Sequence, residues 1–198
     1  MRAARRALLA LALAAPLAGC EKLFSSKSPF NGIDVTGSNM GGELRLADHD
    51  GRQRSLAQFR GRAVVVVFGF THCPDVCPTA LSDLASAVKA LGAEGGRVQV
   101  LFVTVDPKRD RPELMRQFVP AFHPSFLGLT GDEEALAEVR KDFNVYAAIR
   151  AGSSPDNYSV DHSAQMFGFD PQGRIRLVWS PGTLPKQIAD DLRVLLNS

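Results

Sequence analysis

The sequence predicts an α/β three-layer sandwich, in which a sheet lies between two layers of helices. Two continuous apolar runs, residues 63–68 and 98–105, have the β-branched composition of strands that are covered on both faces. Stretches with helical periodicity alternate with such strands, and a hairpin and an amphipathic helix complete the chain. A length of 198 residues, of which 45% are hydrophobic and 22% charged, suits one folded domain with additional segments.

The N-terminal segment predicts export from the cytoplasm. A cationic start, MRAARR, precedes an apolar run over residues 7–18 that only Pro16 interrupts. This run is shorter than the roughly 20 residues needed to span a bilayer, and it has the length of a signal-peptide core. It ends in Leu-Ala-Gly-Cys, which is similar to the bacterial lipoprotein box, where cleavage precedes a lipid-carrying cysteine. We therefore expect a signal peptide over residues 1–19 and lipidation of Cys20, with an uncleaved membrane anchor as the alternative.

Both interpretations place the rest of the chain outside the cytoplasm and attach it to a membrane. Residues 20–41 are polar and rich in Ser, Gly and Asn, which predicts a tether to a domain over residues 42–198. The formal net charge of +2 includes three arginines of the predicted signal peptide, and 20 basic against 21 acidic residues remain without them. Because this composition offers no basic patch, we expect no nucleic-acid partner.

The predicted domain begins with a hairpin and a buried strand. Apolar and polar residues alternate after residue 42, and Asp50-Gly51 is a typical hairpin turn. The run at 63–68 follows as a predicted central strand. A helix comes next, because leucines and valines recur at helical spacing over residues 81–91.

The second half of the domain continues the alternation of strands and helices. The strand at 98–105 precedes a helix for which Asp110 is the predicted N-cap, with Pro112 in the first turn. The remaining predictions are a strand over 126–130, a helix over 132–143, a strand over 145–149, a loop over 151–157, two strands joined by a turn at 170–173, and a helix over 184–196.

Cys73 and Cys77 lie between the first buried strand and the helix that follows it. Pro78 fits the first helical position, since its missing N–H would have no partner there, and this places Cys77 near the N-cap. Free N–H groups and the positive end of the helix dipole favour a thiolate at such a position. We therefore expect a lowered thiol pKa, which a nucleophile or a metal ligand requires.

The spacing of Cys73 and Cys77 allows three interpretations. The usual redox motif has two intervening residues, whereas three intervene here, so both sulfurs can turn toward one point. As soft donors they would supply half of a site for Cu(I), with a third ligand from elsewhere in the fold. A structural disulfide is possible in an oxidising compartment, but the short loop that it closes would stabilise the fold little. A reversible disulfide between the two is compatible with a metal site and with a redox pair.

One of the four histidines is a candidate ligand. His162 stands in YSVDHS, just before a predicted buried strand, and loops at strand ends are where functional sites gather. A neutral imidazole would complete a set of two sulfurs and one nitrogen for copper in either valence. We expect His49, His72 and His123 to be solvated surface residues, with tuning of the thiol chemistry of the adjacent Cys73 as the alternative for His72.

Three segments of the chain resemble the Sco (SenC) family of copper-binding proteins for cytochrome oxidase assembly. They are FGFTHCPDVCP at 68–78, VTVDPKRDRPE at 103–113 and YSVDHS at 158–163, in the order of the family. The resemblance extends from about residue 42 to the end of the chain. The combination is specific, because this cysteine pair followed by a distant Asp-His is rare by chance.

The resemblance implies a thioredoxin-like fold with an extra N-terminal β-hairpin. It implies that Cys73, Cys77 and His162 bind copper, as Cu(I) or Cu(II). The implied partners are the copper-carrying subunit of cytochrome c oxidase and a periplasmic copper donor, with the lipid-anchored protein at the cell membrane, facing the periplasm.

Two features of the sequence depart from this pattern. DHSAQM lacks the proline that thioredoxin-like enzymes carry there, which favours metal binding, and the lipoprotein-type N-terminus replaces the family's common membrane helix.

The resemblance leaves an enzymatic alternative open. Cys73 and Cys77 could act as a thiol-disulfide oxidoreductase that reduces the copper-ligand cysteines of the oxidase subunit, with Cys73 as the attacking thiol. A peroxidase is a weaker third hypothesis, because no Thr or Ser lies three residues before Cys73.

The segment VDPKRDRPE does not obviously carry chemistry. We expect Asp106, Arg109 and Asp110 to brace a loop through ion pairs and capping, with a recognition surface for the partner protein as the alternative.

Overall fold

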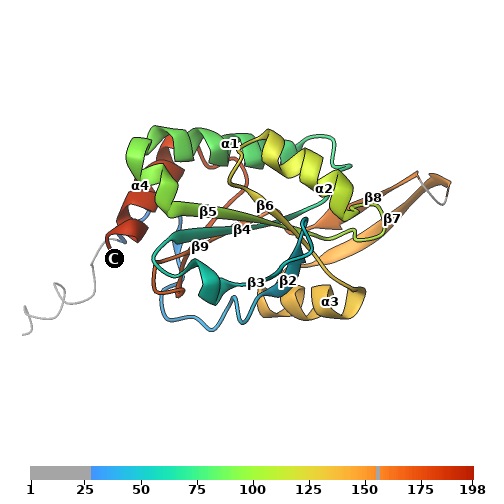
Figure 1. The fold of residues 1–198 in the computed structure, drawn as a ribbon, viewed down its shortest axis with the longest axis horizontal. Coiled ribbons are helices and arrows are strands. Elements are labelled where there is room, and N and C mark those ends of the chain that lie inside the picture. The colour runs from blue at the N-terminus through green and yellow to red at the C-terminus, as the bar shows by residue number, and fades with distance from the viewer. Residues whose placement is uncertain (1–27, 155–156) are drawn as a thin grey trace, which may run out of the picture.

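The computed structural model describes residues 28–154 and 157–198, in which eight strands form one sheet with helices on both faces (Figure 1). The order of the strands in this sheet is β1-β10-β9-β4-β5-β6-β2-β3. The predicted signal peptide, Cys20 and the first part of the predicted tether lie outside the described residues. Within the described ranges, no helix has both the length and the apolar character needed to cross a bilayer.

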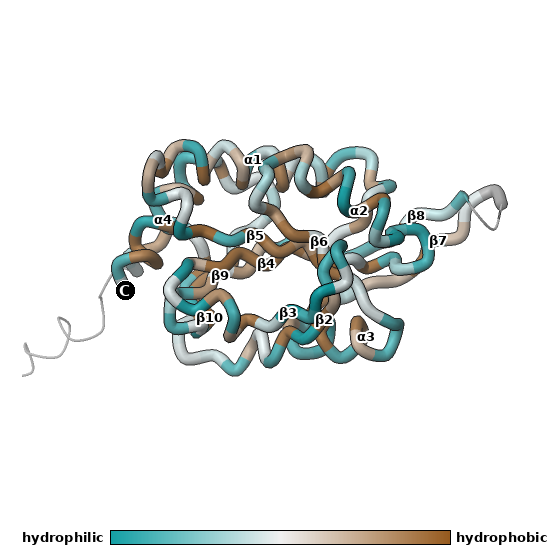
Figure 2. The backbone as a smooth tube through the Cα atoms, in the orientation of Figure 1, coloured by the Kyte–Doolittle hydropathy of each residue, from teal (hydrophilic) through white to brown (hydrophobic). Residues whose placement is uncertain are grey.

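The centre of the sheet is formed by the two predicted buried strands. β4 (Ala63–Gly69) pairs in parallel with β5 (Val98–Thr104), and all seven residues of each are buried. β5 pairs in parallel with β6 (Leu127–Thr130), whereas β9 (Met166–Phe169) pairs antiparallel with β4 on the other side. Figure 2 shows these strands as the hydrophobic centre of the domain, which confirms the predicted sandwich.

The helices divide between the two faces of the sheet. α1 (Val76–Ala90), α2 (Pro112–Phe118) and α4 (Pro185–Leu196) lie on one side, and α3 (Glu133–Asp142) lies on the other (Figure 1). Alternation along β4 sends Phe68 toward α3, where it contacts Phe143 edge-on, and turns Gly69 toward α1. Short 3₁₀ turns cover Leu56–Phe59, Gly92–Arg97 and Val119–Ala121.

Both edges of the sheet carry hairpins. β2 (Arg45–Asp48) and β3 (Gln53–Ser55) form the predicted N-terminal hairpin, and β10 (Ile175–Trp179) returns along β9 as predicted. β1 (Ile33–Asp34) then pairs with β10, although the sequence predicts a tether there. The reason is that Asp191 of α4, which is buried, accepts the backbone N–H groups of Asn31 and Gly32.

Two helix starts differ from the predictions. α1 begins at Val76 with Asp75 as its N-cap, so that Cys77 lies inside the first turn rather than at the cap. α2 begins at Pro112 after Arg111, because the carboxylate of Asp110, the predicted cap, is bound by Thr71 and Thr104 instead.

Residues 151–154 and 157, which were predicted to lie in a loop, belong to the strands of a hairpin. β7 (Ala147–Ser154) and β8 (Asn157–His162) form a second, two-stranded sheet that projects from the domain (Figure 1). Ala147 pairs with His162 in its register. The Ser- and Gly-rich sequence lacks the alternation of apolar and polar residues that predicts a strand. The strand forms because its backbone pairs with the antiparallel neighbour.

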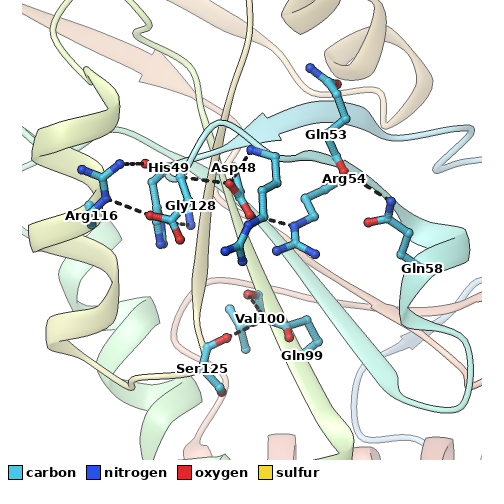
Figure 3. A network of polar contacts seen from close by, with 12 residues as sticks. Asp48, His49, Gln53, Arg54, Gln58, Gln99, Val100, Arg116, Ser125 and Gly128 are labelled. Atoms are coloured by element: carbon cyan, nitrogen blue, oxygen red, sulfur yellow. Dashed lines mark hydrogen bonds and ion pairs between the residues drawn. The ribbon is translucent and has the colours of Figure 1, made fainter.

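The prediction of a solvated surface position is wrong for His49. His49 is buried beside β6, where its Nδ1 accepts the N–H of Gly128 at 3.1 Å. Its carbonyl oxygen accepts a hydrogen bond from Arg116, in the network of polar contacts that Figure 3 shows. This histidine therefore holds the β2–β3 turn against β6 and α2.

Candidate metal centre

The fold brings the predicted donor residues together at one end of the sheet. β4 ends at Gly69, the following loop carries Cys73, and the first turn of α1 carries Cys77. His162 is the last residue of β8, 85 positions after Cys77. The Sγ atom of Cys77 and the Nε2 atom of His162 lie 3.5 Å apart. Sγ of Cys73 accepts the backbone N–H of Cys77 at 3.4 Å, so both sulfurs lie at the start of α1.

Gly69 gives the sulfur of Cys77 its place at the end of β4. A Cβ atom on Gly69 would lie 2.8 Å from Sγ of Cys77 and 2.7 Å from the Phe102 ring. Ordinary contacts between heavy atoms need roughly 3.5–4.0 Å. Only the absence of a side chain at residue 69 therefore lets the thiol lie against the strand.

The hydrogen bonding of His162 determines which ring nitrogen is free. Its Nδ1 atom lies 2.9 Å from the carbonyl oxygen of Ser163, which can only accept a hydrogen bond. Nδ1 therefore carries the proton in the neutral ring, and Nε2 presents its lone pair toward Cys77. Metal-binding histidines have the same arrangement, with one nitrogen fixed by an outer hydrogen bond and the other on the metal.

The two thiols differ in exposure. Cys73 is half-buried and Cys77 is buried, so Cys73 is the more accessible sulfur. Burial raises the pKa of the Cys77 thiol well above its usual range, although a hydrogen bond from the Phe70 backbone acts in the opposite direction. The predicted lowering of this pKa by the helix start is therefore wrong for Cys77, because desolvation outweighs the helix N-terminus.

The donor set has the chemistry that copper prefers. Two thiol sulfurs are soft ligands, and an imidazole nitrogen suits copper in either valence. Within residues 28–154 and 157–198, no three His, Cys, Asp or Glu side chains are already grouped as closely as a metal site requires. The sulfurs would therefore have to turn toward a common ion when one binds. Both thiols would also have to lose their protons, because the thiolate is the form that binds a metal.

The other residues named in the sequence analysis do not form part of this centre. His72 is exposed, as predicted, and His123 is half-buried and paired with Ser125. Asp106 and Asp110 are buried and engaged within the protein. Their contacts are those of the predicted internal bracing rather than those of an exposed recognition surface.

Three residues of the site were not identified from the sequence. Gly69 fits against Cys77, the rings of Phe70 and His162 form a T-shaped pair with centroids 5.9 Å apart, and Tyr158 anchors β8. The signals were present, since Gly69 and Phe70 directly follow a buried strand and Tyr158 opens the segment that contains His162. Sequence alone does not show which neighbours of a ligand face it.

Comparisons with known proteins identify the family of the chain. A model of the family described as SCO1/SenC matches residues 34–197. The human protein named "Protein SCO2 homolog, mitochondrial" is 41% identical over 154 residues, which cover 77% of this chain and 58% of the relative. A "SCO2-like protein" of Rickettsia prowazekii is 35% identical over 160 residues, covering 80% of this chain and 73% of the relative. The chain thus spans less than two thirds of the length of the mitochondrial relative.

Solved structures show the same fold with copper bound. ScoI of Bradyrhizobium japonicum "with copper bound" has a TM-score of 0.73 at 33% identity and covers 79% of this chain and 99% of its own. Yeast Sco1 "with Copper Bound" has a TM-score of 0.74 at 31% identity and covers 81% of this chain and 90% of its own. With a family model that matches almost the whole described domain, and with these neighbours at its fold, the chain belongs to the SCO1/SenC family.

Proposed function

We propose that this chain binds copper through Cys73, Cys77 and His162 and supplies it to the copper-carrying subunit of cytochrome c oxidase. The observation that carries the proposal is the 3.5 Å contact between Sγ of Cys77 and Nε2 of His162. The copper-bound structures of two relatives support the choice of metal.

The unequal exposure of the two sulfurs suits a protein that must release its ion. The sulfur of Cys77 is packed against Gly69 at the end of β4. The ring of His162 is fixed by the hydrogen bond between its Nδ1 and the carbonyl oxygen of Ser163. Cys73 is half-buried on the loop before α1, so a ligand of the acceptor protein reaches the ion from this side first. In this mechanism Cys73 is displaced before the two inner donors.

The proposal includes the location of the protein. The signal peptide over residues 1–19, lipidation of Cys20 and the tether that follows would hold the domain at the cell membrane, facing the periplasm. Support comes from the cationic start, the short apolar run and the Leu-Ala-Gly-Cys sequence. Copper would come from a periplasmic donor protein.

The experiment that tests the proposal compares copper binding among single variants. The reduced protein is loaded with copper, and bound copper is measured per chain for Cys73→Ser, Cys77→Ser and His162→Ala. His123→Ala is the matched control, because His123 is half-buried and hydrogen-bonded outside the centre. We expect one copper per chain in the wild type and in the control, loss of copper in both cysteine variants, and loss of Cu(II) in His162→Ala. Unchanged copper content in the cysteine variants would contradict the proposal.

The same variants test the alternative of thiol-disulfide oxidoreductase activity. Such activity depends on Cys73 and Cys77 and does not need the imidazole of His162. A wild type that reduces protein disulfides catalytically but retains no copper would replace the copper proposal with this alternative.

A further inference from the structure

In the part of the chain that the structure describes, the hairpin that carries His162 has no backbone hydrogen bonds to the main sheet. β7 and β8 pair only with each other in the described sheets, and an isolated two-stranded hairpin is marginally stable in water. β9 begins four residues after His162, so the backbone ties the base of the hairpin to the main sheet, and side chains that pack against the domain fix the direction in which the hairpin runs from that base.

One face of β8 makes these contacts. Along β8, the exposed residues Ser159 and Asp161 alternate with Tyr158, Val160 and His162, which are half-buried or buried. Residues two apart share a face of a strand, so Tyr158 and His162 face the domain together, about 13 Å apart along the strand. A contact that fixes Tyr158 therefore also limits the movement of His162.

Arg109 is the centre of the contacts with Tyr158. Its guanidinium lies 3.6 Å from the centroid of the Tyr158 ring, and its Nη1 donates to the Tyr158 carbonyl oxygen at 2.9 Å. Asp106 accepts from Nε of Arg109 and, at 2.8 Å, from the hydroxyl of Tyr158. Arg109 also lies 5.7 Å from the ring of Phe70, whose edge-on neighbour is His162.

Asp110, the residue directly after Arg109, is bonded to the loop that carries the sulfurs. Asp110 is fully buried and accepts the backbone N–H of Thr71 at 3.1 Å and its hydroxyl at 2.5 Å. It also accepts the hydroxyl of Thr104 at 2.7 Å, at the end of β5. Thr71 lies two residues before Cys73, so one short segment after β5 holds both parts of the centre.

We propose that Asp106, Arg109 and Asp110 form a brace that fixes the distance between the His162 nitrogen and the two sulfurs. The inference rests on the proposed copper function and adds positioning residues to it. Two sulfurs suffice for Cu(I), whereas Cu(II) needs the imidazole, so the brace governs retention of Cu(II) over Cu(I). Arg109 acts through Tyr158 and Phe70 and does not itself bind the metal.

Two conservative variants test the brace. Arg109→Lys keeps the charge but loses the planar stacking and the forked donors. Tyr158→Phe keeps the ring and removes only the hydrogen bond to Asp106. Arg176→Lys is the matched control, because Arg176 also pairs with a buried carboxylate, that of Asp170, and lies 5.7 Å from the Phe30 ring. Its side chain is 18% exposed, against 15% for Arg109.

The first readout needs no metal. Amide hydrogen exchange of residues 157–162 in the metal-free protein is expected to accelerate in Arg109→Lys and Tyr158→Phe and to stay unchanged in Arg176→Lys. Unchanged exchange in both brace variants would overturn the inference, whatever the protein does with copper.

The second readout compares the two valences of copper. Competition with chelators is expected to show a Cu(II) affinity lowered about 10–100-fold in the brace variants, as for other outer-sphere partners of metal ligands, with Cu(I) affinity unchanged. The Cu(II) electron paramagnetic resonance spectrum is expected to change in these variants and not in the control. Cu(I) binding reports intact folding of the loop that carries the sulfurs. If Arg109→Lys binds neither Cu(I) nor Cu(II), the inference is tested with Tyr158→Phe alone.

The outcomes separate the two proposals. If the wild type binds no copper, the proposed function is overturned, and so is the proposed role of the brace in retaining Cu(II). A wild type whose Cu(II) binding requires His162 while both brace variants keep wild-type affinity and spectrum leaves the proposed function intact and overturns the brace.

Discussion

Replacing Gly69 by alanine tests the close approach of Cys77 to the end of β4. The new Cβ would lie 2.8 Å from Sγ of Cys77 and 2.7 Å from the ring of Phe102. Each distance is about 0.7 Å or more below an ordinary contact, so the sulfur and the ring must move. Overpacking of this kind costs about 1–3 kcal/mol of stability. Because the strand is buried on both faces, the movable sulfur should yield before the ring.

The assay for Gly69→Ala combines urea unfolding with copper binding. We expect a loss of about 1–3 kcal/mol in unfolding free energy, together with weaker copper binding, because the displaced sulfur leaves its 3.5 Å contact with His162. Gly168→Ala is the matched control, since its Cβ would lie 3.0 Å from Leu177 and from the Trp179 ring, away from the sulfurs. The control should lose stability and keep copper affinity. A Gly69→Ala protein with wild-type stability and copper affinity would refute the reasoning.

Two further predictions concern buried groups. Burial raises the pKa of Cys77, so the folded protein keeps this thiol protonated at pH values where the unfolded chain ionises it. The stability of the reduced, metal-free protein should therefore fall above about pH 8.5, by up to about 1.4 kcal/mol per pH unit. Urea titrations at pH 8 to 10 should show a smaller slope for Cys77→Ala, and an equal slope would contradict the assignment. Asp191→Ala should cost at least about 1–3 kcal/mol, because the N–H donors of Asn31, Gly32 and Trp179 lose their acceptor. Tryptophan fluorescence during unfolding measures this, and a change of less than about 0.5 kcal/mol would show that residues 31–32 do not contribute to the domain.

The central sheet and its helices could be predicted because their signals are local. Runs of β-branched residues and helical spacing of leucines reflect the burial of each element along its own length. β4, β5 and the four helices were therefore predicted to within a few residues. β1 could not be predicted, because its position is specified by distant partners, β10 and Asp191. The outer part of the β7–β8 hairpin could not be predicted either, because its Ser- and Gly-rich sequence lacks the alternation of apolar and polar residues that indicates a strand.

The candidate site was predictable in its residue types and not in its electrostatics. Spacing and the family resemblance indicated Cys73, Cys77 and His162, and the fold places the latter two in contact. The pKa of Cys77 was predicted in the wrong direction, because sequence shows the helix start but not the depth of burial. The hydrogen bond from Thr71 to Asp110 was also not predicted. An aspartate can cap a helix or accept hydrogen bonds from a neighbouring loop, and the sequence alone does not show which of the two occurs.

The coordination of bound copper tests the central claim most directly. X-ray absorption of the Cu(II)-loaded protein should show two sulfur ligands and one imidazole nitrogen, and the same measurement on His162→Ala should show the imidazole replaced. An unchanged imidazole signal in that variant, or a copper ion with no sulfur neighbours, would contradict the account.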